Sequence, residues 1–492
     1  MTDRDFELLL QSDMSDLPPS DELVDAVNPW RTAMNRILWG MGLVTITLNF
    51  LALDAILPAI GMVLMLLGYR TLRRENRWFG LGYVLVILRT IWLLVHIFWD
   101  ATIYSCEFNA SNVAITGRYF QIVISFLHLI CLRGGIRAVQ KKAGMDPHAG
   151  SATALIIWYV IITCLALMNF EGYAVYILLI AYICILRSLW KLSKELDDAG
   201  YAVNAAPSAV RDHVVMIAYA AVIALLLTIG YTCFARYPMD WTVQEESGNT
   251  HLELLDLGFP EYVLNDLTEE ELLRCENAAK VYVDTEELPA SDGYEVYEET
   301  GQFSAKIYTA YKAKELLVTA VAVEPENPED DWLIIHHFLW KEDPGYRGTE
   351  AIQIWPAYMK NDGWVSTNYL SGRVLYDEDG ATCTAPYRRL EEISYSYTWF
   401  FGTNDSTDII ATFSFPRDGE NCRGYVCYGA KEVEKGWLLN SWCNYFYQQT
   451  FLQFPVGTAE EAVLSHNFGH NEAIKANQTA IQMSQEERDN YP

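Results

Sequence analysis

Four polar side chains recur along one apolar stretch of the sequence, GRYFQIVISFLHLICLR at residues 117–133. They are Arg118, Gln121, Ser125 and His128. Their spacings of three, four and three residues place them within about 80° of one another on one face of an α-helix. A guanidinium beside amide, hydroxyl and imidazole groups is suited to holding an anion. A histidine in such a row could also change its protonation near neutral pH.

The preceding apolar stretch, residues 78–100, carries a second polar face. Arg89, His96 and Asp100 fall within about 40° of one another on a helix. The two stretches would run antiparallel, with Arg89 at about the depth of Ser125. We therefore expect the two polar faces to meet or to line one cavity.

Arg89 is the residue that most needs a partner. An arginine at the centre of a membrane span costs about 2.5 to 3.5 kcal/mol on insertion scales. Two interpretations stay open: a polar cavity that binds an anionic lipid or a small anion, or polar contacts that join packed helices for about 0.6 kcal/mol each. No Asp or Glu lies at the depth of Arg89 in any span, since Asp54, Asp100, Glu107 and Glu171 would all lie at the outer rim. In the first interpretation the ligand-binding residues would be Arg89, His96, Arg118, Gln121, Ser125 and His128.

Membrane-spanning helices are the elements that would position these residues. A span needs roughly 20 apolar residues, with 17 to 25 the usual range. The first two candidates, residues 35–53 and 55–70, are short. They would form a helical hairpin that either barely crosses the bilayer or enters it and returns to the same side. Seven stretches qualify or nearly qualify, at residues 35–53, 55–70, 78–100, 113–133, 153–169, 173–190 and 213–235.

Lysine and arginine are unevenly distributed among the short loops between these stretches. Because basic loops face the cytoplasm, seven spans would place the N-terminus inside and the chain after residue 237 outside a cell membrane. The first 30 residues are acidic and lack the basic start and apolar core of a cleavable signal peptide. Three alternate loops hold eleven basic residues and the loops between them hold none; the eleven are Arg70, Arg73, Arg74, Arg77, Arg133, Arg137, Lys141, Lys142, Arg187, Lys191 and Lys194.

Net charge changes near the same boundary. Residues 1–235 carry 17 Lys and Arg against 18 Asp and Glu, whereas residues 236–492 carry 18 against 45. An acidic C-terminal half argues against binding nucleic acid or anionic lipid headgroups there, because both require a cationic surface.

The C-terminal half has the pattern of an antiparallel β-rich domain. Short segments such as ISYSYTWF at 393–400 and IIATFSF at 409–415 alternate apolar and polar side chains, which favours a sandwich or an open barrel. The predicted fold class is α+β, a seven-span transmembrane helical bundle followed by an extracytoplasmic, sandwich-like domain. The expected parts are an acidic cytoplasmic tail at 1–34, the transmembrane domain at 35–236, a short helical connector at 237–280, the β-rich domain at 281–458 and a helical or disordered tail at 459–492.

Motifs for catalysis are absent from the C-terminal sequence. It contains no GxSxG, P-loop or GxGxxG pattern. His336 and His337 are neighbours on a predicted strand, so they must point to opposite faces. Cys422 and Cys427 are a candidate disulfide pair. We therefore predict no catalytic residue, no metal and no cofactor.

Four segments, LLDLGFPEYVLNDLTEEELL, HHFLW, GTEAIQIWPAY and GRVLYDEDGATCTAPY, together resemble a family of uncharacterised multi-pass membrane proteins from Gram-positive anaerobes. The resemblance covers residues 250–455 or so and is weaker over the spans. It implies no activity, only a bacterial cell membrane with a domain on its outer surface, where few disulfides are expected.

The sequence thus predicts a multi-pass membrane anchor that presents an acidic domain for binding or sensing outside the cell, without catalysis. Its partners would be the lipid bilayer and an extracellular protein or glycan, since tryptophans from Trp332 to Trp442 would form core or stack on sugars. The alternative is a transporter or lipid-handling protein that uses the polar stripe of the third and fourth spans to bind an anionic lipid or a small anion.

Overall fold

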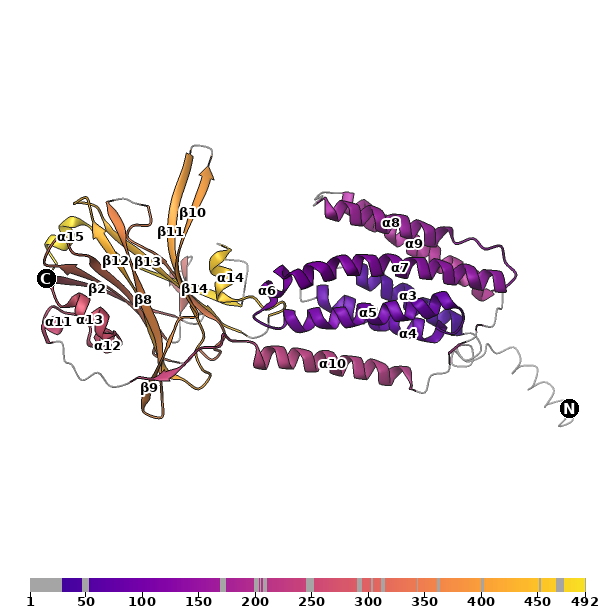
Figure 1. Ribbon diagram of the computed structural model, residues 1–492, viewed down its shortest axis with the longest axis horizontal. Coiled ribbons are helices and arrows are strands. Elements are labelled where there is room, and N and C mark those ends of the chain that lie inside the picture. The colour runs from indigo at the N-terminus through magenta and orange to yellow at the C-terminus, as the bar shows by residue number, and fades with distance from the viewer. Residues whose placement is uncertain are drawn as a thin grey trace. The chain divides into compact units, whose positions relative to one another are not determined.

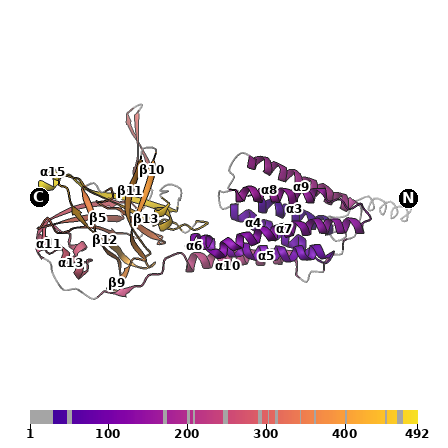
Figure 2. The ribbon, with the colours of Figure 1, turned by 45° about the horizontal axis from the view of Figure 1, so that its top comes forward.

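A computed structural model describes residues 29–46, 53–168, 174–198, 203, 205–206, 210–244, 252–289, 294–301, 304–310, 315–342, 344–360, 363–399, 402–450, 453–465 and 473–491. Contacts divide the chain into two compact units, a helical unit within Met1–Gly230 and a β-rich unit within Tyr231–Pro492 (Figure 1, Figure 2). The predicted cytoplasmic tail lies outside the described residues as far as residue 28.

The helical unit is a bundle of long apolar helices. Six of them, α4, α5, α7, α8, α9 and α10, are long and apolar enough to cross a membrane. The remaining long helix, α3, has 17 residues and corresponds to the first predicted span. In chain order the helices are α3 (Pro29–Thr45), α4 (Leu53–Leu72), α5 (Arg77–Asp100), α6 (Ser105–Ala110), α7 (Asn112–Lys142), α8 (Gly150–Leu167), α9 (Ala174–Asp198) and α10 (Asp212–Cys233).

Large apolar side chains lie on the surface of this bundle as well as inside it. Trp30, Phe79 and Leu132 are buried in its core, whereas Ile177 and Ile217 are about two-thirds exposed. A soluble surface rarely gathers many such residues. A bundle that is apolar on its outside is suited to contact with lipid chains.

Helices α3 and α4 pack closely because small residues face one another along both. A Cβ added at Gly61 would lie 2.6 Å from the carbonyl oxygen of Gly40, and one at Gly68 would lie 2.6 Å from that of Ala33. Both pairs are seven residues apart on their helices, in antiparallel order. Small residues let backbones approach where lipid removes the hydrophobic driving force, so the predicted hairpin forms as two paired helices.

Helices α5 and α7 pack with aromatic rings of α5 against glycines of α7. The ring of Trp92 occupies the place that a Cβ at Gly117 would take, and a Cβ at Gly135 would lie 2.8 Å from the ring of Phe79. This packing brings the two predicted polar helices side by side (Figure 1).

The β-rich unit contains two large antiparallel sheets and a separate hairpin. The strand orders are β1-β9-β8-β12-β6-β5-β2, β10-β11-β7-β13-β14 and β3-β4. The strands are β1 (Thr242–Val243), β2 (Ala278–Leu288), β3 (Tyr294–Gly301), β4 (Ser304–Ala310), β5 (Leu316–Pro325), β6 (Trp332–Trp340), β7 (Glu350–Trp355), β8 (Trp364–Glu378), β9 (Ala381–Pro386), β10 (Arg389–Trp399), β11 (Gly402–Phe413), β12 (Glu420–Glu432), β13 (Leu439–Gln448) and β14 (Ile474–Met483).

One hydrophobic core joins the two large sheets. Phe338 of β6 lies 5.4 Å from the ring of Phe413 on β11 and 4.8 Å from that of Tyr445 on β13, measured between ring centroids. Trp340 Nε1 donates a hydrogen bond to Tyr445 Oη at 3.0 Å. Of the tryptophans that the sequence left as core or sugar-stacking, Trp332, Trp340 and Trp364 are buried in this core, whereas Trp437 is exposed. The predicted antiparallel β-rich architecture is confirmed.

Three short helices cover the other face of the seven-stranded sheet (Figure 1). Val263, Leu272 and Cys275 of these helices are buried with Leu333 and Ile335 of β6. The helices are α11 (Leu252–Asp256), α12 (Glu261–Leu264) and α13 (Glu269–Cys275), and α14 (Ala459–Leu464) and α15 (Gln485–Asp489) follow later in the chain. The helical connector therefore acts as a third layer, which holds polar residues over the sheet.

Two features of the β-rich unit differ from expectation. Cys422 and Cys427 form no disulfide: both lie on β12, five residues apart, which is about 16 Å on an extended strand and far beyond the separation of about 7 Å that a bridge allows. The tail after residue 459 contains strand β14, which pairs with β13 along its whole length. The sequence did not indicate this strand, because the adjacent apolar residues Ala480 and Ile481 interrupt the alternation that marks a half-buried strand.

Candidate functional site

A cavity of about 60 Å³ lies inside the helical unit. Its polar lining comes from five helices, and the remainder of the wall is apolar. The polar lining residues are Thr45 on α3, Arg89 on α5, Ser125 and His128 on α7, Tyr159 on α8 and Tyr182 on α9.

The structure brings together three of the six residues predicted from the polar stripes, Arg89, Ser125 and His128, and separates the others. Arg118 is exposed, and its guanidinium donates to the carbonyl oxygen of Asn109 at 3.1 Å. His96 packs against aromatic rings, with Phe108 at 5.5 Å. Gln121 does not line the cavity, and its buried Nε2 has no partner among the described residues.

Polar atoms around the cavity lack partners. His128 is 1 % exposed, and neither of its ring nitrogens bonds to any residue that the structure describes. The hydroxyl of Tyr69, whose ring lies 5.0 Å from that of His128, is also buried and unbonded within the described chain. Buried polar groups in folded proteins are nearly always hydrogen-bonded, so these unbonded atoms are available to water or to a polar ligand.

Sequence reasoning missed the hydroxyl groups that complete the lining. Tyr182 Oη donates to the carbonyl oxygen of Met41 and accepts from Thr45 Oγ1, both at 2.9 Å. Tyr159 Oη donates to the carbonyl oxygen of Ile122 at 3.4 Å. Isolated tyrosines in apolar stretches give no sign of which helices will meet, so only the packing reveals them.

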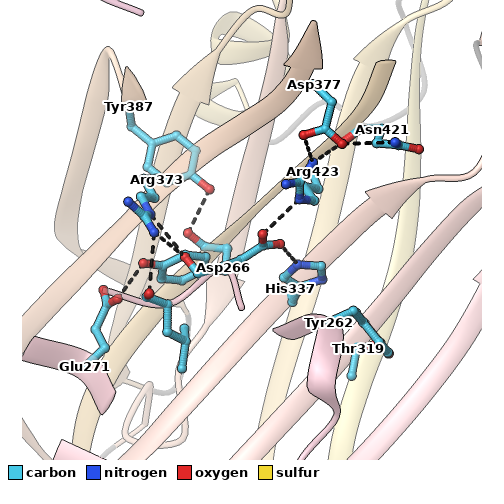
Figure 3. A network of polar contacts seen from close by, with 12 residues as sticks. Tyr262, Asp266, Glu271, Thr319, His337, Arg373, Asp377, Tyr387, Asn421 and Arg423 are labelled. Atoms are coloured by element: carbon cyan, nitrogen blue, oxygen red, sulfur yellow. Dashed lines mark hydrogen bonds and ion pairs between the residues drawn. The ribbon is translucent and has the colours of Figure 1, made fainter. Parts of the chain in front are cut away.

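A second pocket, of about 260 Å³, opens on the outer face of the seven-stranded sheet. Figure 3 shows its polar residues converging from strands β6, β8 and β12, from helix α12 and from the turn between α12 and α13. They are Tyr262, Asp266, His337, Asp377, Asn421 and Arg423, and Asn265 and Leu339 complete the lining.

Strand β6 supplies the histidine of this pocket. His336 points into the sandwich core, where its Nε2 lies 2.8 Å from Ser441 Oγ, and His337 points to the helical layer, where its Nε2 lies 2.8 Å from Asp266 Oδ2. The predicted opposite orientation of the two histidines is confirmed. Burial lowers the pKa of His336 to about 3, so its imidazole stays neutral at physiological pH.

A short turn positions Asp266. Two residues later, Thr268 caps the start of α13 and forms a capping box with Glu271. Arg373 donates to the main-chain oxygen of Asp266 from NH2 at 2.7 Å and from Nε at 3.1 Å (Figure 3). Glu271 is itself buried and accepts from Ser371 Oγ at 2.6 Å and from the hydroxyl of Tyr425. Hydrogen bonds from strands β8 and β12 thus fix both the turn and the first residues of α13 over the sheet.

Arg423 joins the two carboxylates of the pocket. Its Nε lies 2.8 Å from Asp266 Oδ1, and its NH1 lies 3.0 Å from Asp377 Oδ1. Asn421 donates to the other oxygen of Asp377 at 3.0 Å. Burial opposes ionisation of Asp377, but the hydrogen bonds from Asn421 and Arg423 outweigh it and lower the pKa of this carboxyl. Asp377 is therefore ionised at neutral pH.

The fixed side chains of this pocket are better suited to binding a polar ligand than to transferring a proton in catalysis. Both oxygens of Asp266 are committed, to His337 and to Arg423. Carboxylate, amide and guanidinium groups held in fixed directions, with the exposed ring of Tyr262 at the edge, can bind a polar ligand that carries hydroxyl groups. Sequence reasoning missed the set because its members come from four separate segments.

Comparison with known proteins gives no assignment: no protein-family model matches the chain, and no curated protein is detectably similar to it. The fold and the two polar sites define the class of protein, a chain that joins a bundle of helices suited to a membrane to an antiparallel β-rich unit with a ligand-sized pocket.

Proposed function

We propose that this chain is a seven-span membrane protein whose β-rich unit lies outside the cytoplasm. There, the pocket around Asp266 would bind a hydroxyl-bearing ligand, the end of a glycan chain, without catalysing a reaction. The N-terminus would face the cytoplasm.

The topology is supported by α3 and by the distribution of basic residues. At about 1.5 Å per residue, the 17 residues of α3 extend about 25 Å, near the lower limit for a span. Its antiparallel pairing with α4, through Gly40 and Gly61, favours equal depth for both helices. Seven spans with the basic loops inside would put the β-rich unit on the opposite side from the N-terminus.

The pocket in the β-rich unit carries the binding proposal. Its volume of about 260 Å³ is just below the usual range of small-molecule sites, about 300 to 1,000 Å³, and fits a single small polar group. Asp377 and Asn421 line the pocket with a carboxylate and an amide group, and Tyr262 offers a ring for stacking. Because ion pairs hold these groups before any ligand arrives, binding would order few side chains.

Sidedness is tested with single added cysteines and a membrane-impermeant maleimide on intact cells. Lys435→Cys, on an exposed turn of the β-rich unit, should react before permeabilisation. Asp146→Cys, between α7 and α8, should react only afterwards. The wild type gives the background from native cysteines. Labelling of Asp146→Cys in intact cells would contradict the proposed orientation.

Ligand binding is tested with the full-length protein in lipid nanodiscs on a glycan array. Asn421 has φ +46° and Asn368 has φ +59°, so glycine at either position keeps the left-handed backbone without strain. Asn421→Gly should lose glycan binding at least tenfold, whereas Asn368→Gly, outside the pocket, should bind as the wild type does. Equal binding by the two variants, or no glycan bound by the wild type, would contradict the proposal.

A further inference from the structure

We propose that the cavity inside the helical unit, lined by Arg89, Ser125 and His128, binds a small monovalent anion of the size of chloride. This site is separate from the glycan pocket. It lies in the helical unit, whereas the pocket around Asp266, which we propose to bind a glycan, belongs to the β-rich unit.

Charge is the first argument. Arg89 makes no hydrogen bond or ion pair with any residue that the structure describes, and the described lining contains no Asp or Glu. An arginine side chain cannot shed its proton in a protein, and an uncompensated buried charge is strongly unfavourable. A bound anion would neutralise the guanidinium where the chain itself offers no carboxylate.

The hydrogen-bonding groups point to the same ligand class. Arg89 offers only donors, Ser125 offers a hydroxyl, and His128 carries a ring N–H in either tautomer. Both nitrogens of His128 are unbonded within the described chain although the side chain is 1 % exposed. Donors that converge on one space, with no acidic acceptor beside them, fit an anion.

Size selects among anions. A volume of about 60 Å³ holds about four to six waters at 10 to 15 Å³ each, or one halide with a few waters. Met41, Leu129 and Leu155 form apolar walls, which offer no hydrogen bonds to the outer oxygens of a phosphate. The single fixed charge matches a monovalent ion, so we assign the site to a halide-sized anion and not to a phosphate headgroup.

The experiment measures chloride binding to purified full-length protein in detergent, with sodium gluconate replacing sodium chloride at constant ionic strength. Line broadening in chloride NMR should saturate with the wild type and be reversed by bromide. Arg89→Gln should weaken chloride affinity at least tenfold, and Ser125→Ala about threefold or more, because one of several donors is lost. Arg118→Gln is the matched control, since this exposed arginine lies outside the cavity, and it should bind as the wild type does.

Three outcomes would overturn the assignment. The first is a wild type whose chloride response equals that of Arg89→Gln. The second is a Ser125→Ala variant with the same chloride affinity as the wild type, together with chloride line broadening in the wild type that bromide does not reverse. This outcome would overturn the assignment even if Arg89→Gln does not fold. The third is native mass spectrometry that finds a lipid on the wild type and none on folded Arg89→Gln, since the anion would then be a lipid headgroup.

Discussion

His337 and Asp266 lie 2.8 Å apart, from Nε2 to Oδ2, although 71 positions separate them in the sequence. Strand β6 directs the histidine to the outer face of its sheet, and the turn before α13 brings the carboxylate over it (Figure 3). Arg423 completes the group at 2.8 Å from the other oxygen of Asp266. These contacts tie the helical layer to the sheet, so the stability of the unit depends on the residues that line the proposed binding pocket.

Removing the carboxylate of Asp266 should destabilise the β-rich unit. Asp266→Ala leaves Arg423 and His337 without their partner, and breaking a buried ion pair from one side costs about 3 to 5 kcal/mol. Urea unfolding of the full-length protein, followed by tryptophan fluorescence, measures the change. Asp379→Asn is the control, because this exposed turn residue has φ +50°, which asparagine tolerates. A loss within about 0.5 kcal/mol for Asp266→Ala, the usual effect of a surface substitution, would show that the network contributes little.

His336 should make the β-rich unit less stable as the pH falls. Burial lowers its pKa in the folded state from 6.5 to about 3, so between these values the unfolded chain binds a proton that the folded chain does not. The free energy of unfolding therefore falls as the pH drops below 6.5, by at most about 1.4 kcal/mol per pH unit. Above pH 6.5 this contribution is constant.

The test for His336 compares urea midpoints at pH 7.5 and pH 5. His336→Gln keeps a side chain that can bond to Ser441 but cannot titrate, so it should lower stability at pH 7.5 and flatten the pH dependence. His148→Gln, a substitution at an exposed histidine, should leave the slope unchanged. A slope in His336→Gln equal to that of the wild type would assign the pH dependence to other groups.

Gly117→Ala should disturb the packing of α5 on α7. The new Cβ would overlap the ring of Trp92, and overpacking of this kind costs about 1 to 3 kcal/mol. Gly150→Ala is the matched control at the start of α8, where no atom lies within 4 Å of an added Cβ. Thermal unfolding in detergent should show a lower midpoint for Gly117→Ala and an unchanged or higher one for Gly150→Ala. The reverse order would argue against the close approach of the two helices.

The cysteines of the β-rich unit should be reduced and slow to react. Burial raises the pKa of both Cys275 and Cys443 to about 12, and the thiolate is the reactive form. After denaturation without reductant, mass spectrometry should find alkylation at all ten cysteines of the chain. In the native protein at pH 8, Cys275 and Cys443 should remain unlabelled over the time in which the exposed Cys106, on the short helix α6, reacts. A mass two labels short after denaturation would reveal a disulfide.

The sequence by itself determined the elements and their chemistry. Apolar length predicted the helices suited to a membrane, because a span must be long and apolar to cover the hydrocarbon layer. Alternation predicted the strands and the opposite orientation of His336 and His337, because successive side chains of a strand point to opposite faces. The capping box of Thr268 and Glu271 is equally local, because it depends on residues only three positions apart.

Only the tertiary structure decided which polar residues meet. The helical periodicity grouped seven residues on two faces, but packing selected Arg89, Ser125 and His128 and added hydroxyls from three other helices. The pocket of Asp266, His337 and Arg423 gave no signal in the sequence. Such contacts depend on the order of strands in a sheet and on how layers stack, and the local spacing of residues does not encode either.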